Sequence, residues 1–272
     1  MNAKEFDLRG RKIPRIIYQT IGDGEIPLPI KENIEKIKKE NPEWDYRLYR
    51  DKDIESFIET EFGNNVLKIY KKIDDSYGAA RADLFRYLIL YKYGGVYLDI
   101  KSRFYGPISQ FVKGDEGFII SQWSNAVGEK YEGFGLKSEL SFIPGGEFQQ
   151  WHIIAAPGHP FLREVVESII KKVNSYRPWK DGTGKVGVLN LTGPIIYTKT
   201  IYPILDLYPH KFIRRESDIG LEYSIFGKDK HKNAFVLHYS KLQNPIVKPS
   251  FWLQIPYALW NVARKLKSII KI

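Results

Sequence analysis

The stretch Ala79–Asp99, which reads A-A-R-A-D-L-F-R-Y-L-I-L-Y-K-Y-G-G-V-Y-L-D, decides the fold of this chain. Its first fifteen residues are mostly apolar and predict a helix, and the pair of glycines that follows them ends it. The next apolar residues predict a buried strand with the carboxylate of Asp99 at its C-terminal end. A helix that leads through a glycine turn into a buried strand is typical of an α/β fold with a mixed, mostly parallel sheet.

Strands and helices alternate along the rest of the chain in the same manner. The predicted strands cover 13–18, 46–49, 118–120, 152–155 and 235–238. The predicted helices cover 30–40, a segment that begins with Asp51 as its N-cap, 161–173 and 193–202. Ligands of such sheets bind outside the carboxyl ends of the strands, so the polar residues there are candidate site residues. The pattern predicts a single domain over 1–242, followed by a separate segment over 243–272.

Composition narrows the classes of function. The chain has 272 residues, a formal net charge of +10, 14% aromatic residues and no cysteine. The absence of cysteine excludes disulfides, thiolate metal sites and cysteine nucleophiles. Basic, aromatic-rich proteins bind nucleic acids, anionic membranes, or phosphorylated and sugar ligands. No nucleic-acid-binding motif is present, so we expect no nucleic-acid partner. No apolar run is long enough for a membrane-spanning helix, and no secretory signal is visible.

Asp83 and Arg86 lie three residues apart in the predicted helix and therefore share one of its faces. Taken alone, such a pair is usually a surface ion pair that contributes little. Here the surrounding helix is apolar, and an α/β sheet would bring it to the strand end that carries Asp99. A carboxylate at that place can hold a metal ion or a ribose hydroxyl, and an arginine can bind a phosphate.

The stretch 79–99 resembles the sugar-binding region of glycosyltransferase family thirty-two. This family of GT-A-fold enzymes is related to initiating α-mannosyltransferases, bacterial capsule sugar transferases and glucosylating toxins. Shorter blocks also resemble the family in order along the chain, at 13–20, 41–46, 150–160 and 192–194. The similarity is strong over 13–108 and diffuse over 140–240.

The resemblance implies an enzyme that transfers a sugar, with retention, from a UDP- or GDP-sugar to a glycan or lipid-linked acceptor in surface polysaccharide synthesis. It implies no catalytic base, because the leaving phosphate can take the proton of the acceptor hydroxyl. The expected catalytic residues are Asp83, Arg86 and Asp99. The expected donor- and nucleotide-binding residues are Tyr18, Gln19, Thr20, Arg81, Lys101 and Lys241. Trp151 is expected to stack on the acceptor sugar, or else to belong to the core.

Lys101 departs from the family pattern, in which a second aspartate two residues after Asp99 is usually a metal ligand. A protonated lysine cannot bind a metal ion and repels one nearby. Three readings follow: Lys101 replaces the metal ion, Asp99 holds Mn²⁺ or Mg²⁺ together with His238, or the strand bends and Lys101 faces away.

The segment 251–272 combines apolar residues at helical spacing with four basic residues and no acidic one. This pattern predicts a helix that lies in an anionic membrane interface, although a helix docked on the domain is the simpler alternative. We therefore expect a cytoplasmic protein, peripheral on the inner face of the membrane. Two other functions stay open, a degenerate carbohydrate- or membrane-binding protein without activity and a glycoside hydrolase.

Overall fold

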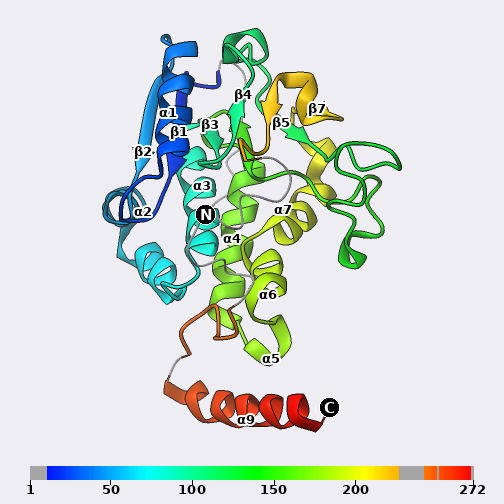
Figure 1. Ribbon diagram of the computed structural model, residues 1–272. Coiled ribbons are helices and arrows are strands. Elements are labelled where there is room, and N and C mark those ends of the chain that lie inside the picture. The colour runs from blue at the N-terminus through cyan, green and yellow to red at the C-terminus, as the bar shows by residue number, and fades with distance from the viewer. Residues whose placement is uncertain (1–10, 227–241, 250, 271–272) are drawn as a thin grey trace.

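A six-stranded sheet in the order β2-β1-β3-β6-β5-β7 forms the centre of the computed structural model (Figure 1), which describes residues 11–226, 242–249 and 251–270. Its strands are β1 (Ile16–Thr20), β2 (Asp45–Tyr49), β3 (Gly95–Leu98), β5 (Phe118–Ser121), β6 (His152–Ala155) and β7 (Lys211–Ile213). A small second sheet pairs β4 (Arg103–Phe104) with β8 (Leu221–Glu222). Strand β1 runs parallel to β2 and β3, and β5 runs parallel to β7, whereas β6 is antiparallel to both neighbours. The expected mixed, mostly parallel sheet is confirmed.

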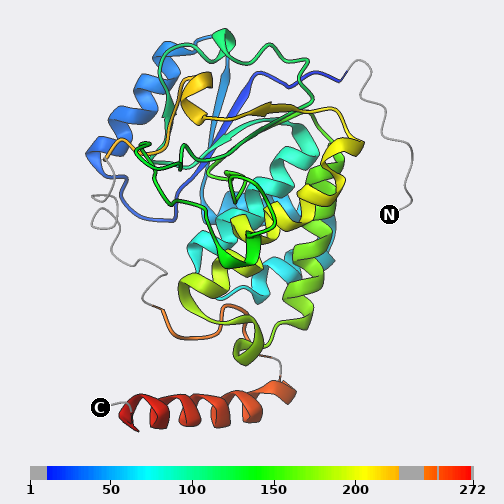
Figure 2. The same ribbon diagram turned by 90° about the vertical axis from the view of Figure 1, so that its right-hand side faces the viewer.

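Helices cover both faces of this sheet (Figures 1 and 2). The α-helices of the described residues are α1 (Leu28–Glu40), α2 (Asp51–Lys72), α3 (Gly78–Tyr93), α4 (Pro160–Ser175), α5 (Pro178–Asp181), α6 (Gly184–Leu191), α7 (Pro194–Ile201) and α9 (Gln254–Ile270). The larger apolar core joins α2, α3, α4, α6 and α7 to one face of the sheet. A second core joins α1 and the β4–β8 sheet to the other face. Helix α9 lies apart from both cores, at the end of the molecule near α5.

Most predicted elements are confirmed within a few residues, one boundary differs, and one strand lies outside the described residues. The N-cap of α2 is Arg50 rather than Asp51; its backbone N–H donates to the carboxylate of Asp53 at 2.9 Å, which leaves Asp51 inside the first turn. The predicted strand 235–238 lies outside the described residues.

Gly94 and Gly95 bring the end of α3 directly onto the start of β3. Both have left-handed backbone angles, with φ of +65° and +106°. A Cβ atom on Gly94 would lie 2.7 Å from the backbone nitrogen of Pro157, and one on Gly95 would lie 2.7 Å from the carbonyl oxygen of Ile16. The turn therefore needs glycine for conformation and for space.

We predict that Gly94→Ala lowers the free energy of unfolding by about 2 kcal/mol or more, because alanine is strained at this φ and meets backbone that cannot move cheaply. Gly78→Ala is the matched control, since its added Cβ meets nothing within 4 Å and its φ is ordinary. Urea denaturation of both variants measures the difference, and equal stabilities would contradict the prediction.

Candidate active site

A cavity of about 630 Å³ opens where β1 and β3 end and α3 begins. Its wall takes residues from these elements, from the loops between β5 and β6, and from α6. This volume lies in the range that small-ligand sites usually have. The cavity also lies at the carboxyl ends of parallel strands, which is the place predicted for the site.

Arg86 lines the cavity, and its guanidinium joins a cluster of charged groups. It lies 3.2 Å from a carboxylate oxygen of Asp83 and 3.0 Å from one of Asp99. It also donates to the carbonyl oxygen of Gln150 at 2.6 Å and lies 4.6 Å from the ring centroid of Tyr97. The side chains of Arg86 and Asp83 are only 6% and 5% exposed. The pair predicted from helix spacing is thus a buried ion pair and not a surface one.

Asp83 is fixed by three partners on different elements. Besides Arg86, the hydroxyl of Thr192 donates to it at 2.9 Å and the side-chain amide of Gln150 donates at 3.1 Å. Burial raises the pKa of Asp83 to about 6, although the charge of Arg86 and both hydrogen bonds act in the opposite direction. Its place is therefore set by a network that spans three distant parts of the chain.

Hydrogen bonds to the backbone of Asp99 hold this residue in place, and its carboxylate lies at the cavity. Its N–H donates to the carbonyl oxygen of Trp151 at 2.7 Å, and its own carbonyl accepts from the amide of Gln19 at 3.0 Å. The side chain is 25% exposed, far more than those of Asp83 and Arg86. Asp99 is accordingly the member of the cluster that a ligand can reach most easily.

Lys101 lines the same cavity, although the strand no longer continues there. Strand β3 ends at Leu98, and the N–H of Ser102 donates back to the carbonyl of Asp99 at 2.8 Å in a turn. The ammonium of Lys101 donates to the hydroxyl of Tyr223 at 2.9 Å. Burial lowers the pKa of Lys101, while the charge of Asp99 opposes this. The predicted bend occurs, yet it does not turn Lys101 away from the site.

Several residues that line this cavity lie in a region that is similar to known proteins. Residues 27–117 match the model of a protein family described as "Glycosyltransferase sugar-binding region containing DXD motif". These residues are similar to that family, and we call them the DXD-family region. The resemblance found in the sequence is confirmed, and the DXD-family region contains Asp83, Arg86, Asp99 and Lys101.

Curated relatives of the DXD-family region extend over more of the chain. The "Initiation-specific alpha-1,6-mannosyltransferase" of Candida albicans is 27% identical over 220 residues, which are 72% of this chain and 54% of that protein. The "Inositol phosphoceramide mannosyltransferase 3" of Schizosaccharomyces pombe is 26% identical over 200 residues, which are 71% of this chain and 46% of that protein. The chain thus spans about half the length of these relatives.

Two solved structures share the fold. The UDP-bound glycosyltransferase domain from the YGT toxin has a TM-score of 0.52 at 8% identity, over 86% of this chain and 84% of that one. The structure described as "PaToxG Glycosyltransferase" has a TM-score of 0.51 at 15% identity, over 72% and 70% of the two chains. Both have the GT-A architecture, so the fold expected for the DXD-family region and the strands around it is confirmed.

The predicted nucleotide-binding run 18–20 divides between core and cavity. Tyr18 is fully buried in the larger core, where burial raises the pKa of its hydroxyl, and it does not line the cavity. Gln19 is also buried and joins Asp99 to the hydroxyl of Tyr46, which donates to it at 2.7 Å. Thr20 lines the cavity. The assignment of Tyr18 is corrected to a core residue, and Gln19 supports Asp99 without reaching the cavity.

Arg81 also needs correction. It lies two residues before Asp83 and therefore projects from the opposite side of α3. Its guanidinium donates to the carbonyl oxygen of Ile73 at 3.1 and 3.2 Å and pairs with Asp75. Arg81 fixes the turn between α2 and α3, and it does not line the cavity. Trp151 does line it but is only 4% exposed, so it is part of the wall.

Glu147 and Tyr223 also line the cavity. Glu147 is 8% exposed and accepts a hydrogen bond from the indole of Trp123 at 2.8 Å. Burial raises the pKa of Glu147. Glu147 lies in a loop and Tyr223 follows a two-residue strand, so neither position carries a periodic signal that could have indicated it.

A divalent ion held by protein side chains does not fit the part of the cavity that the structure describes. No three His, Asp or Glu residues lie close enough together to form a metal site within the described ranges. Asp99 already faces the guanidinium of Arg86, and Lys101 takes the place of the second aspartate. His238 and Lys241, the expected metal ligand and phosphate contact, lie outside the described residues.

The raised pKa of Asp83 predicts a pH-dependent stability. Between its ordinary value of 3.8 and about 6, the folded state keeps a proton that the unfolded state releases. The free energy of unfolding therefore falls as the pH rises through this window. Asp83→Asn removes this dependence, so from pH 4 to pH 7 the stability difference should move in favour of the variant by up to about 3 kcal/mol.

Chemical denaturation at several pH values between pH 4 and pH 7 measures this difference. Asp23→Asn, on an exposed loop, is the matched control and should leave the shape of the wild-type curve unchanged. A constant difference in stability between Asp83→Asn and the wild type across this pH window would contradict the raised pKa of Asp83.

Proposed function

We propose that this protein is a glycosyltransferase that moves a sugar from a nucleotide-diphosphate donor to a glycan or lipid acceptor. The observation that carries the proposal is the buried Arg86, which faces the cavity between Asp83 and Asp99 inside the DXD-family region. The curated relatives that cover most of this chain include mannosyltransferases, which supports a sugar transfer. Mannose is therefore the first sugar to test.

Two of the cations that line the cavity, Arg86 and Lys101, suit a diphosphate leaving group. As the bond between C1 of the sugar and the phosphate oxygen breaks, negative charge develops on the diphosphate. Cations already held in place stabilise that charge without reorganisation. Arg86 and Lys101 both line the cavity. In this proposal Arg86 contacts the phosphates next to the sugar, and Asp83 holds Arg86 in position.

The reaction proposed here proceeds with retention and needs no protein base. The acceptor hydroxyl attacks C1 from the face that the diphosphate leaves, so that the new C1–O bond forms as the old one breaks. The proton of the hydroxyl passes to the leaving phosphate oxygen. Asp99, the most exposed carboxylate of the cluster, accepts hydrogen bonds from the donor sugar.

A glycoside hydrolase suits this cavity less well. Hydrolases use two carboxylates that flank the bond they cleave, one as acid and one as base or nucleophile. Asp83 and Asp99 are instead paired with the same guanidinium, and Asp83 is almost fully buried.

The role that a divalent ion has in related enzymes falls, in our proposal, to Lys101 and Arg86. The alternative is an Mn²⁺ or Mg²⁺ ion held by Asp99 and His238, and it makes the opposite prediction about chelators. We further propose that residues 1–242 form the catalytic domain. The basic segment 243–272 would then attach it to an anionic membrane surface, on the cytoplasmic side.

The test is a donor screen with UDP- and GDP-sugars, mannose included, in the presence of EDTA and separately of Mn²⁺. We predict release of nucleotide from one donor at similar rates in both conditions. We also predict that Lys101→Met lowers kcat by about 10²- to 10³-fold, because one preorganised charge opposite the developing phosphate charge is lost.

Lys113→Met is the control for this substitution, since Lys113 is an exposed lysine of a surface loop that does not line the cavity. Turnover that requires Mn²⁺ and persists in Lys101→Met would replace the lysine proposal with the metal alternative. No turnover of any donor by the wild type would favour a binding protein without activity.

A further inference from the structure

Helix α9 turns its apolar side toward solvent. Ile255, Leu259 and Val262 follow one another at spacings of four and three residues, so they share one face of the helix. They are 74%, 67% and 57% exposed. Trp252, at the start of the segment, is 83% exposed. An amphipathic helix of a globular domain normally buries such a face, and this one leaves it open.

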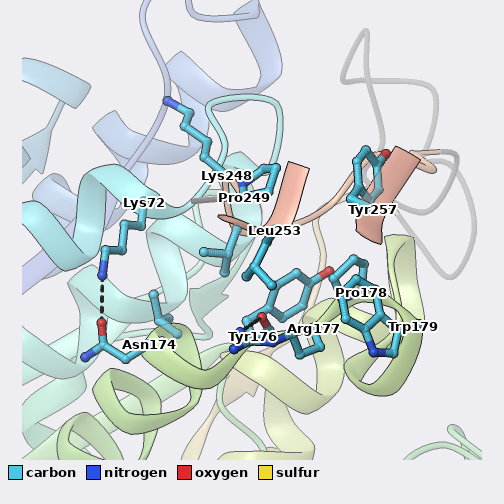
Figure 3. Close-up of a pocket in the computed structure, with 12 residues that line it drawn as sticks. Lys72, Asn174, Tyr176, Arg177, Pro178, Trp179, Lys248, Pro249, Leu253 and Tyr257 are labelled. Carbon is cyan, nitrogen blue, oxygen red and sulfur yellow. Dashed lines mark hydrogen bonds between the residues drawn. The ribbon is translucent and has the colours of Figure 1, made fainter. Parts of the chain in front are cut away.

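The opposite side of α9 faces the body of the protein. Leu253 and Tyr257 line a small cavity of about 60 Å³ between α9 and the ends of α4 and α5, as Figure 3 shows. Arg264 donates to the carbonyl oxygen of Gln243 at 3.2 Å. These contacts fix which face of the helix is inward. The outward apolar face is therefore a consequence of how α9 is attached.

The positive charge of the segment indicates what kind of partner binds this face. Besides the inward Arg264, residues 251–272 contain three basic residues and no acidic one. Pairing with a second copy of the same helix would bring like charges together, whereas anionic lipid headgroups attract them. Trp252, the exposed aromatic residue at the start of the segment, has a side chain of a type that favours the membrane interface.

We infer that the Ile255–Leu259–Val262 face of α9 inserts into the surface of an anionic phospholipid bilayer, with the helix axis parallel to that surface. Helix α9 has 17 residues, and no helix in the described parts of the chain is long and apolar enough to cross a membrane. An amphipathic helix of this kind buries its apolar face at the boundary of headgroups and acyl chains.

This docking brings one rim of the candidate active site to the membrane side of the molecule. Gln243, which holds α9 through Arg264, is followed by Asn244, whose side-chain amide donates to the hydroxyl of Ser76 at 3.1 Å. Ser76 lines the large cavity. Helix α6, which supplies another part of the cavity wall, lies on the same side as α9 (Figures 1 and 2). The acceptor, if the proposed function holds, is then a lipid-borne one.

Sedimentation with vesicles tests the docking. The wild type should bind vesicles of 70% phosphatidylcholine and 30% phosphatidylglycerol at least tenfold more tightly than vesicles of phosphatidylcholine alone. The double variant Leu259→Glu/Val262→Glu should lose at least tenfold of this binding. Val127→Glu/Leu207→Glu introduces the same charge at two other exposed apolar positions and should bind like the wild type.

Absence of binding by the wild type, or equal binding by Leu259→Glu/Val262→Glu, would overturn the inference. So would a wild-type dimer in solution that this variant converts to a monomer, because the face would then be occupied by a second copy. Nucleotide release from a donor, measured without vesicles, should be equal in the variant and the wild type. Vesicle binding without any such release would leave the docking intact and reject only the proposed function.

The orientation has its own test, because the chain contains no cysteine and accepts single labelling sites. A fluorophore on Lys180→Cys, in α5 beside α9, should be quenched by lipid-borne quenchers when vesicles are added. A fluorophore on Lys39→Cys, in α1 far from α9, should not be quenched. Equal quenching at both positions would contradict the proposed orientation.

Discussion

The site depends on one constraint, which is that a buried guanidinium must be neutralised where it stands. Arg86 is 6% exposed and has carboxylates of Asp83 and Asp99 at 3.2 and 3.0 Å. Buried ion pairs of this kind cost about as much in desolvation as they return in attraction, so they add little to stability. Removing one partner is nevertheless costly, because an unpaired buried charge remains. The cluster of Arg86, Asp83 and Asp99 therefore contributes to ligand binding more than to the stability of the fold.

Much of the surrounding fold serves to bring these three groups together. Asp83 and Arg86 come from one turn of α3, whereas Asp99 comes from the end of the next strand. The close turn at Gly94 and Gly95 lets the strand start directly beside the helix. Thr192 and Gln150 then fix Asp83 from two distant segments. The β1 strand contributes Gln19, which holds the backbone of Asp99.

The sequence alone predicted those parts of the structure that local patterns determine. Helical spacing placed Asp83 and Arg86 on one face, and the end of an apolar run placed Asp99 at a strand end. Arg81 was assigned wrongly because it lies two residues before Asp83 and therefore leaves α3 on the opposite side, toward Ile73 and Asp75. Tyr18 was assigned wrongly because it lies inside β1, beside Tyr97 of β3 and buried in the core, whereas Thr20 ends the strand at the cavity.

Contacts between distant residues could not be predicted from the sequence. Lys101 meets Tyr223, which lies 122 positions later, and no spacing rule connects them. Glu147 enters the cavity from an irregular loop. The composition and spacing of 251–272 did indicate an amphipathic helix. Which of its faces points outward depends on the contacts of Leu253, Tyr257 and Arg264, and only the structure gives these.

The central claim is that Arg86 and Lys101 receive the diphosphate of a sugar nucleotide. A crystal structure of the full chain with a bound nucleoside diphosphate tests it most directly. Our account predicts phosphate oxygens within hydrogen-bond distance of the Arg86 guanidinium and the Lys101 ammonium, with no metal ion between protein and phosphate. A diphosphate that lies away from both cations, or that is held by a metal ion bound to Asp99, would contradict it.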